Sequence, residues 1–288
     1  MQTEIKSSFL AIKINSFGAE VCSVKNNNGL EFIWQADKAV WARHAPVLFP
    51  IVGKLKDSFF LYKNKKYELP QHGFARDMEF TLVEQKENAC TFQLIATNET
   101  QIKFPFEFIF QITYFVIENK LETHYKVINP SNEKTYFSVG AHPGFNCPIA
   151  PNEKPEDYYL EFETNAFSQT KLNNGLRTNE KVPLNLEDKK LFLKKELFDN
   201  DALIFEGGQI SEISLCSTKS NHKVTLQCPN WPYFGIWMKK GNTQFICLEP
   251  WHGIADSNSS INELTKKVGT IELPPKTEFN SHFSLIFS

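Results

Sequence analysis

Four short segments of the chain collect polar side chains among glycine and proline residues. They are residues 41–54 (WARHAPVLFPIVGK), 71–77 (QHGFARD), 139–148 (VGAHPGFNCP) and 248–256 (LEPWHGIAD). An ionisable group embedded in aromatic, strand-like sequence carries a desolvation cost unless it has a structural partner or a ligand. These segments are therefore the candidate sites.

Glu249 is the first candidate for chemistry. It shares the parity of Phe245 and Cys247, so its carboxylate points to a side where apolar groups otherwise lie. A glutamate at a strand end that bonds to backbone or to an arginine is the simpler interpretation of such a residue taken alone. The case for a functional role rests on what the other segments contain.

Two histidines flanked by glycine add to that case. His142 follows Gly140 and precedes a Pro-Gly pair, and His72 directly precedes a glycine. Each alone is also explained as a hydrogen-bonded core histidine. Together with Glu249 they favour a site, because a carboxylate and an imidazole on opposite sides of a substrate act as general base and general acid, each worth roughly 10² to 10⁴ in rate. The pairing does not name a reaction.

Arg43, Arg76 and Lys54 are the basic residues of these segments. Each is either a salt-bridged surface side chain, with Asp77 as an adjacent partner for Arg76, or a donor to hydroxyls, a carboxylate or a phosphate. The sequence leaves both interpretations open.

The spacing of the metal-ligating residue types does not favour a metal site. His44, His72 and His142 lack the short i, i+4 spacing, and the six cysteines contain no CxxC pair. A nucleophilic triad is also disfavoured, since the sequence has no GxSxG motif. We therefore expect no metal and no cofactor, and we interpret the cysteines as buried free thiols in a reducing compartment.

Charge and hydropathy exclude two classes of partner. The net charge of -2 creates no field that would hold a polyanion, so nucleic acid is not expected. No run approaches 18 uncharged apolar residues, so we expect neither a signal peptide nor contact with a membrane, and a cytoplasmic location.

The segments that must position these residues alternate with period two. In residues 106–117 (FEFIFQITYFVI) the apolar side chains share one parity, and residues 121–127 alternate likewise after the three-residue connection 118–120. This pattern predicts a β-hairpin. The same period recurs in four further segments, which are residues 91–96, 223–228, 245–249 and 280–287.

Helical signals are few. Residues 186–198 carry Leu and Phe at mixed spacings, and residues 260–263 resemble a capping box before a short helical turn. Many strands without crossover helices predict an all-β antiparallel sandwich, whose interior the 26 phenylalanines would fill. No linker divides the chain, so we expect one domain over residues 1–288.

Taken together and in order, the four segments resemble the aldose 1-epimerase (galactose mutarotase-like) family, and within it the LacX-type bacterial branch. The resemblance rests on residues 43–53 (RHAPVLFPIVG), 71–76 (QHGFAR), 140–145 (GAHPGF) and 248–251 (LEPW), and it covers nearly the whole chain. It implies a galactose mutarotase-like supersandwich of large antiparallel sheets with few short helices, and an open cleft that binds an aldose.

The resemblance also implies roles for individual residues. By motif position His142 resembles the family's catalytic acid and Glu249 its base, His72 resembles the second active-site histidine, and Arg43 a sugar-binding arginine. These assignments agree with the acid and base that the residue types suggest on their own.

Two further assignments follow from the resemblance. Asp201 resembles the sugar-binding aspartate, although Asp199 lies only two residues away. Arg76 belongs to an HGFAR form of the motif that also occurs in the hexose-6-phosphate epimerase branch, where it would help to bind a charged substrate. Galactose specificity does not carry over, because the chain is shorter than the galactose enzymes and its second segment differs.

The activity implied is aldose 1-epimerase: interconversion of the α and β anomers of a hexose by acid–base ring opening and closure. The alternative activity is hexose-6-phosphate 1-epimerase, whose substrate would be a phosphorylated hexose. Two alternatives to an enzyme remain. One is a non-catalytic carbohydrate-binding protein on the same fold, and the other is a lectin-like domain in which the four segments are merely turns. The expected partner is a small-molecule aldose or hexose phosphate, with a homodimer as a possible assembly.

Overall fold

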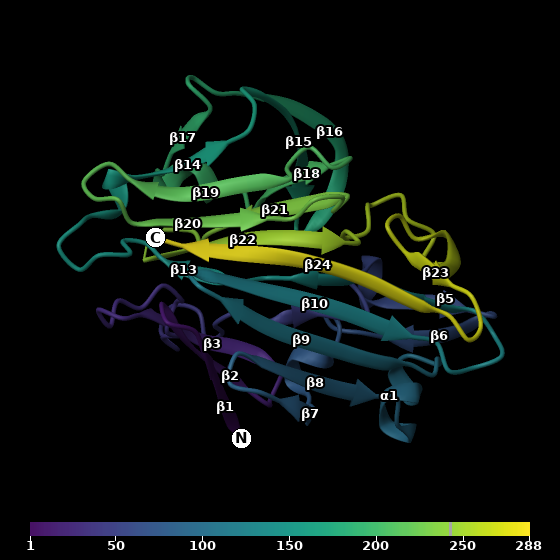
Figure 1. Ribbon diagram of the computed structural model, residues 1–288. Coiled ribbons are helices and arrows are strands. Elements are labelled where there is room, and N and C mark those ends of the chain that lie inside the picture. Colours follow the sequence, from purple (N-terminus) through teal and green to yellow (C-terminus); the bar gives the residue numbers. More distant parts are fainter. Residues whose placement is uncertain (242–243) are drawn as a thin grey trace.

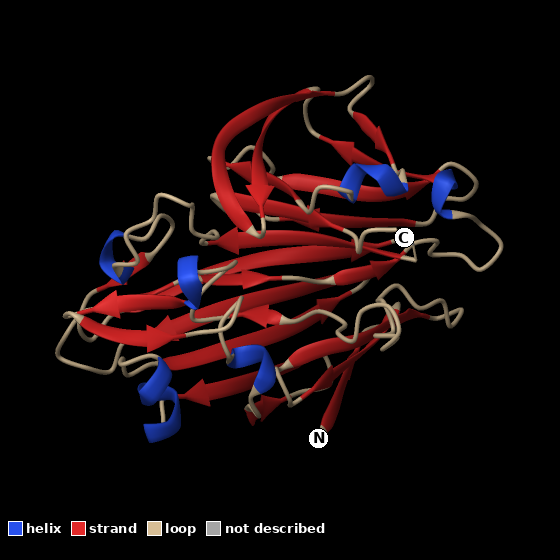
Figure 2. Ribbon diagram, turned by 180° about the vertical axis from the view of Figure 1, so that it is seen from behind, coloured by secondary structure: helices blue, strands red, loops and turns tan. Residues whose placement is uncertain are grey.

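The alternating segments form two large antiparallel sheets in the computed structural model, which describes residues 1–241 and 244–288 (Figures 1 and 2). The larger sheet has nine strands in the order β17-β14-β19-β20-β24-β10-β9-β8-β7. Its strands run side by side across the molecule in Figure 1. In that order they are Lys190–Phe192, Tyr158–Phe162, Glu212–Ser217, Lys223–Gln227, Glu278–Phe287, Lys120–Ile128, Ile109–Ile117, Ala89–Ile95 and Thr81–Gln85.

The second large sheet carries the strands that bear the candidate site. Its order is β16-β15-β18-β21-β22-β12-β4, and β13 also pairs with β22. These strands are Leu176–Asn185 (β16), Ala166–Asn173 (β15), Leu203–Glu206 (β18), Tyr233–Trp237 (β21), Phe245–His252 (β22), Val139–Ala141 (β12), Val47–Leu48 (β4) and Gly144–Asn146 (β13).

Smaller sheets and short helices complete the described structure. The small sheets contain β1 (Gln2–Lys6), β2 (Leu10–Asn15) and β3 (Glu20–Asn26); β5 (Phe59–Tyr62) and β6 (Lys65–Glu68); and β11 (Thr135–Phe137) and β23 (Ile271–Leu273). The helical elements are α1 (Asn98–Lys103) and the 3₁₀ turns η1 (Lys56–Ser58), η2 (Ala75–Asp77), η3 (Pro155–Asp157), η4 (Lys195–Phe198) and η5 (Leu264–Lys266). The prediction of an all-β fold with few short helices is confirmed.

The predicted hairpin is present as β9 and β10. The even-numbered residues of β9 from Phe110 to Val116 are buried, as are the odd-numbered residues of β10 from Leu121 to Val127. Lys120 already pairs with Ile117, so the connection has two residues where three were expected. The alternation located this element because one face of each strand is buried and the other is not.

The phenylalanines fill the interior, as the composition suggested. Phe49 stands at the centre of a cluster in which its ring centroid lies 4.6 Å from that of Phe110 and 5.0 Å from that of Phe108. Such aromatic contacts add to the free energy gained by burying the ring area. All six cysteines are buried and free.

The helical interpretation of residues 186–198 is wrong over most of its length. These residues include strand β17, which pairs with β14, and only the last four form the turn η4. Residues 260–263 do precede the turn η5, but no side chain caps it. A capping box is found instead at α1, where the Thr97 side chain accepts from the Thr100 N–H.

Candidate active site

All six predicted site residues line one cavity of about 540 Å³. They come from segments far apart in the sequence and include the two arginines, the two histidines and both carboxylates: Arg43, His72, Arg76, His142, Asp201 and Glu249. The structure thus brings the candidates together.

The sheet register places His142 opposite Glu249. Strand β12 pairs with β22 through Gly140 and Trp251, and β13 pairs with the same strand through Gly144 and Cys247. His142 lies in the short connection between β12 and β13, and Glu249 is the residue of β22 between the two pairings. The sharp Gly-flanked turn in the sequence therefore aims the imidazole at the carboxylate.

The two side chains are in direct contact and almost completely buried. His142 Nε2 lies 3.2 Å from Glu249 Oε2, and the side chains are 10% and 2% exposed. Trp41 stacks on the imidazole with ring centroids 5.1 Å apart, and Trp237 meets it edge-on at 5.7 Å. The aromatic rings fix the orientation of His142 and help to shield the pair from solvent.

Burial raises the pKa of Glu249 and lowers the pKa of His142. Desolvation raises the pKa of Glu249 well above its usual value, and the nearby Asp201 carboxylate adds to this. Desolvation lowers the pKa of His142 to about 3, and the positive charge of Arg76 acts in the same direction. Both shifts favour the neutral forms. The shifts therefore favour a protonated carboxyl group on Glu249 and a neutral imidazole on His142.

His72 is held as a neutral imidazole beside this pair. Gly53 N donates to His72 Nδ1 at 3.2 Å, and the ring centroid lies 5.7 Å from that of His142. Desolvation lowers the pKa of His72 well below its usual value, with further contributions from His142 and Arg76. The following Gly73 is required, because a Cβ there would lie 2.3 Å from the carbonyl oxygen of Phe49.

Arg43 and Arg76 both have protein partners and both line the cavity. Arg43 Nη2 lies 2.9 Å from Asp77 Oδ1, while Arg76 Nη2 donates to the Gln71 carbonyl oxygen at 2.7 Å. Desolvation lowers the pKa of Arg76 to about 10, which leaves it charged at neutral pH. Each arginine can therefore be bound by a protein group, as a structural side chain would be, and still face a ligand in the cavity.

Asp201, rather than Asp199, lies in the cavity. Asp201 adopts a left-handed backbone conformation with φ of 82°, and its Oδ1 accepts from Ala202 N at 2.8 Å. Both Asp201 and Glu249 line the cavity, and the charge of Asp201 contributes to the raised pKa of Glu249. Asp199 instead lies 3.8 Å from Lys240 Nζ in an exposed ion pair.

Several residues that line the cavity were not among the candidates predicted from the sequence. These are two tryptophans, Ile254, and a wall formed by the end of β15 and the turn to β16: Trp41, Trp237, Ile254, Leu172, Asn174 and Gly175. Trp41 begins a candidate segment and could have been found from it. The residues of the turn have no chemical signature, and only the fold brings them to the cavity.

Buried polar atoms without a hydrogen-bond partner concentrate at this cavity. Among the described residues, five buried side-chain nitrogen or oxygen atoms have no such partner, and four belong to cavity residues: Arg76 Nε, His142 Nδ1, Trp251 Nε1 and Glu249 Oε2. Glu249 Oε2 is among them because its 3.2 Å contact with His142 Nε2 lacks hydrogen-bond geometry. Buried polar groups in native structures are normally satisfied, so a cluster of exceptions requires an explanation. Atoms of this kind suit a ligand that carries several hydroxyl groups.

Cys247 brings a third donor close to the pair. Ligand atoms of His142, Cys247 and Glu249 lie within 4.8 Å of one another, which makes this the group among the described residues that could hold a metal ion. Desolvation raises the pKa of Cys247 well above its usual value. The thiol is therefore protonated at neutral pH, and a thiol is a much poorer metal ligand than a thiolate. The arrangement suits acid–base chemistry better.

Comparisons with known proteins identify the family and agree with this fold. A family model described as aldose 1-epimerase matches residues 1–263. The LacX protein encoded on a plasmid of Lactococcus lactis subsp. lactis is 32% identical over 289 aligned residues, which cover 96% of this chain and 95% of that protein. The chain belongs to the aldose 1-epimerase family.

Solved structures show the same fold. A galactose mutarotase related enzyme from Lactobacillus acidophilus superposes with a TM-score of 0.96 at 37% identity, covering 100% of this chain and 97% of that chain. A galactose mutarotase-like protein from Lactobacillus casei gives a TM-score of 0.91 at 29% identity, with both chains covered completely. The galactose mutarotase-like fold is therefore confirmed.

None of the helices in the described part of the chain has the length and apolar character needed to cross a bilayer.

Proposed function

We propose that the protein is an aldose 1-epimerase that interconverts the α and β anomers of a hexose. The observation that carries this proposal is the buried contact of 3.2 Å between His142 Nε2 and Glu249 Oε2 at a cavity lined by polar groups. Mutarotation needs one group to accept a proton and a second to donate one within the span of a hemiacetal, and this pair offers both.

The proton balance of the pair fits the reaction. In the reactive tautomer Glu249 is ionised and His142 is protonated. Glu249 accepts the proton of the C1 hydroxyl while His142 donates its proton to the ring oxygen, so that the C1–ring oxygen bond breaks and an open-chain aldehyde forms. Rotation about C1–C2 and closure on the other carbonyl face reverse both transfers and give the other anomer.

The burial of the pair supports the open-chain stage of this sequence. After ring opening Glu249 is protonated and His142 is neutral, and these are the forms that desolvation favours. Before and after the step the pair and the substrate together hold the same protons. A complete cycle therefore needs no proton from solvent.

The residues around the pair would bind and orient the sugar in the proposed reaction. Arg43 and Asp201 would bind sugar hydroxyls as donor and acceptor, and the neutral His72 would orient the sugar near the ring oxygen. Trp41 and Trp251 present flat apolar surfaces in the cavity lining that suit the C–H face of a sugar ring.

One observation favours a second substrate class. Arg43, Arg76 and Lys54 all line the cavity, and Arg76 Nε is buried there without a hydrogen-bond partner among the described residues. A guanidinium group pairs well with phosphate. A hexose 6-phosphate is therefore the alternative substrate of the same reaction.

Polarimetry with a panel of freshly dissolved anomers tests the proposal. We expect the protein to accelerate equilibration of α-glucose, α-galactose or their 6-phosphates well beyond a blank without protein, and the ratio of kcat/KM values between free and phosphorylated sugars to identify the substrate class. Rates equal to the blank for every sugar would refute the enzyme. Calorimetric titration would then distinguish a sugar-binding protein from one that binds no monosaccharide.

The pH dependence of kcat/KM should show a broad plateau. That parameter reports the free enzyme, in which a second proton joins the pair only near the lowered pKa of His142, about 3, and the single proton leaves only well above the usual pKa of Glu249. We expect little change between about pH 4.5 and 6.5, which span the usual pKa values of the two groups. Initial rates corrected for the blank at each pH would measure this. An acid limb centred near the usual pKa of histidine would contradict the assignment.

A further inference from the structure

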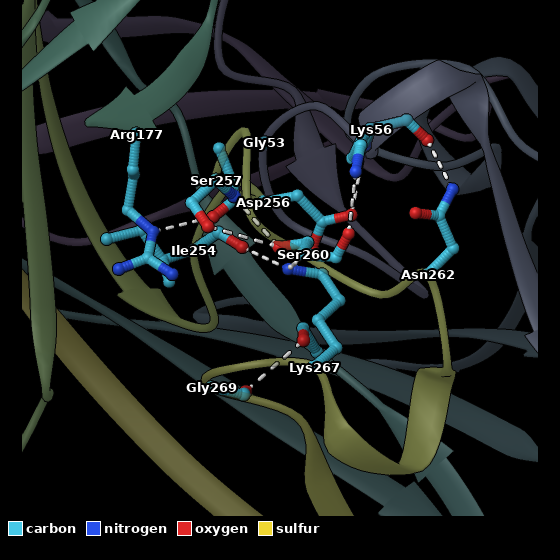
Figure 3. Close-up of polar contacts among 12 residues, drawn as sticks. Gly53, Lys56, Arg177, Ile254, Asp256, Ser257, Ser260, Asn262, Lys267 and Gly269 are labelled. Carbon is cyan, nitrogen blue, oxygen red and sulfur yellow. Dashed lines mark hydrogen bonds and ion pairs between the residues drawn. The ribbon is translucent and has the colours of Figure 1, made fainter. Parts of the chain in front are cut away.

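The loop of residues 253–256 forms one wall of the cavity. It follows β22 directly, and its residues Ile254 and Ala255 line the cavity. The carbonyl groups of this loop are bound by two basic residues, Arg177 and Lys267, which Figure 3 shows on either side of it. The position of this wall therefore depends on what binds its backbone.

Three successive carbonyl oxygens of the loop each accept a hydrogen bond from one of these two residues. Lys267 Nζ donates to the Ile254 carbonyl oxygen. Arg177 Nε donates to that of Ala255 at 2.7 Å, and Arg177 N donates to that of Asp256 at 2.8 Å. Because two of these three donors are charged, and charged donors form the stronger hydrogen bonds, this loop is held firmly for a segment without regular structure.

The cation of Lys267 is itself buried and paired. Lys267 Nζ lies 3.3 Å from Asp256 Oδ1, and both side chains are only 4% exposed. Asp256 Oδ2 accepts from Lys56 N at 3.0 Å, and Asp256 N donates to the Lys54 carbonyl oxygen at 2.9 Å. The ion pair therefore joins the loop to the segment that follows Gly53.

Arg177 connects the loop to the opposite wall. It lies at the start of β16, two residues after Gly175 in the turn that lines the cavity. Its Nη1 lies 3.2 Å from Glu206 Oε2, and its side chain is 12% exposed. Lys54 Nζ supports the same turn by donating to the Asn174 carbonyl oxygen at 3.0 Å. The guanidinium and the backbone N–H of Arg177 thus both join the loop to the wall formed by the β15–β16 turn.

We propose that Arg177 and Lys267 are positioning residues that hold the 253–256 loop and the β15–β16 turn at the separation that binds the sugar. The inference rests on the proposed function. Neither residue is in the cavity lining, so they act through the walls. His142 and Glu249 are fixed separately by the pairing of β12, β13 and β22. Loss of the contacts that Arg177 and Lys267 make with the loop should therefore weaken substrate binding and leave the chemical step intact.

Arg177→Ala tests the proposal most directly. We expect KM to rise on the order of tenfold while kcat stays nearly unchanged, because misplaced walls reduce uniform binding of the sugar. Arg177→Lys keeps the charge but not the fork of donors, and should restore part of the loss. Lys181→Ala, an exposed basic residue on the same strand, is the matched control and should keep the wild-type KM.

Hydrogen exchange measured by mass spectrometry supplies a readout that does not depend on activity. In Arg177→Ala, the amides of residues 253–257 and 173–177 should exchange faster than in the wild type, and those of β12 and β22 should not. If Arg177→Ala fails to fold, the kinetic constants and the hydrogen exchange can both be measured on the Arg177→Lys variant instead.

The experiments distinguish failure of the positioning role of Arg177 and Lys267 from failure of the proposed epimerase activity. An active wild type with an unchanged KM in Arg177→Ala, or a loss confined to kcat, overturns the inference alone. Unchanged exchange of both walls also overturns it. A wild type that neither binds nor converts any sugar overturns the proposed function and the inference with it.

Discussion

Glu249→Gln and His142→Asn should each slow the interconversion of anomers by at least about a hundredfold, the lower end of the contribution of a general acid or base. A glutamine in place of Glu249 cannot accept the C1 hydroxyl proton, and an asparagine in place of His142 cannot protonate the ring oxygen. Both replacements stay polar and introduce no larger side chain, so the cavity should survive. The rate of optical rotation change after dissolving one anomer, corrected for the blank, measures the effect.

His252→Asn is a matched control for this experiment. His252 lies on the same strand as Glu249 and is partly buried, with a pKa lowered to about 4 by desolvation. Its Nε2 lies 2.8 Å from Ser281 Oγ, and its ring packs on Trp231, away from the cavity. This variant should retain the wild-type rate. Wild-type rates in a folded Glu249 or His142 variant would disprove the assigned roles.

The sequence predicted the strands best where one face is buried and the other exposed. The hairpin of β9 and β10 was located from alternation alone, because a shift by one residue would turn every apolar side chain outward. Residues 186–198 misled the prediction, because their apolar side chains have mixed spacing that suits neither period. Pairing with β14, which no local pattern reveals, makes residues 190–192 a strand.

The candidate site was predictable to the extent that its residues stand in unusual local contexts. His142 and Glu249 were found because Gly, Pro and aromatic residues surround them, and the register of β12 and β13 on β22 explains why they meet. Their contact itself depends on strand pairing between segments about a hundred residues apart in the chain, and so do their opposite pKa shifts. No pattern within either segment could have shown these features.

Lys266 and Lys267 show most clearly that burial cannot be predicted from the local sequence. Lys266 and Lys267 are adjacent and chemically identical in the sequence, yet Lys266 is exposed whereas the side chain of Lys267 is 4% exposed and paired with Asp256. Burial of one lysine follows from the turn η5 and from the path of the 253–256 loop. A composition-based view treats both as solvated charges.

Lys267→Met should lower the free energy of unfolding by about 3–5 kcal/mol, the usual result of removing one partner from a buried ion pair. Methionine fills the space of the lysine stem but leaves the Asp256 carboxylate buried without its cation, and the Ile254 carbonyl oxygen loses a donor. Urea-induced unfolding at neutral pH, followed by tryptophan fluorescence, measures the change.

The double variant Lys267→Met with Asp256→Asn separates the buried charge from the lost packing. The asparagine side chain is neutral and its amide oxygen can still accept from Lys56 N, so most of the lost stability should return, because replacing both partners removes the uncompensated charge. Lys134→Met is the control, since Lys134 pairs with Glu272 at the surface and should change stability little. A single Lys267 variant as stable as the wild type would mean that the pair does not hold the wall. A double variant as unstable as the single one would assign the loss to packing instead of charge.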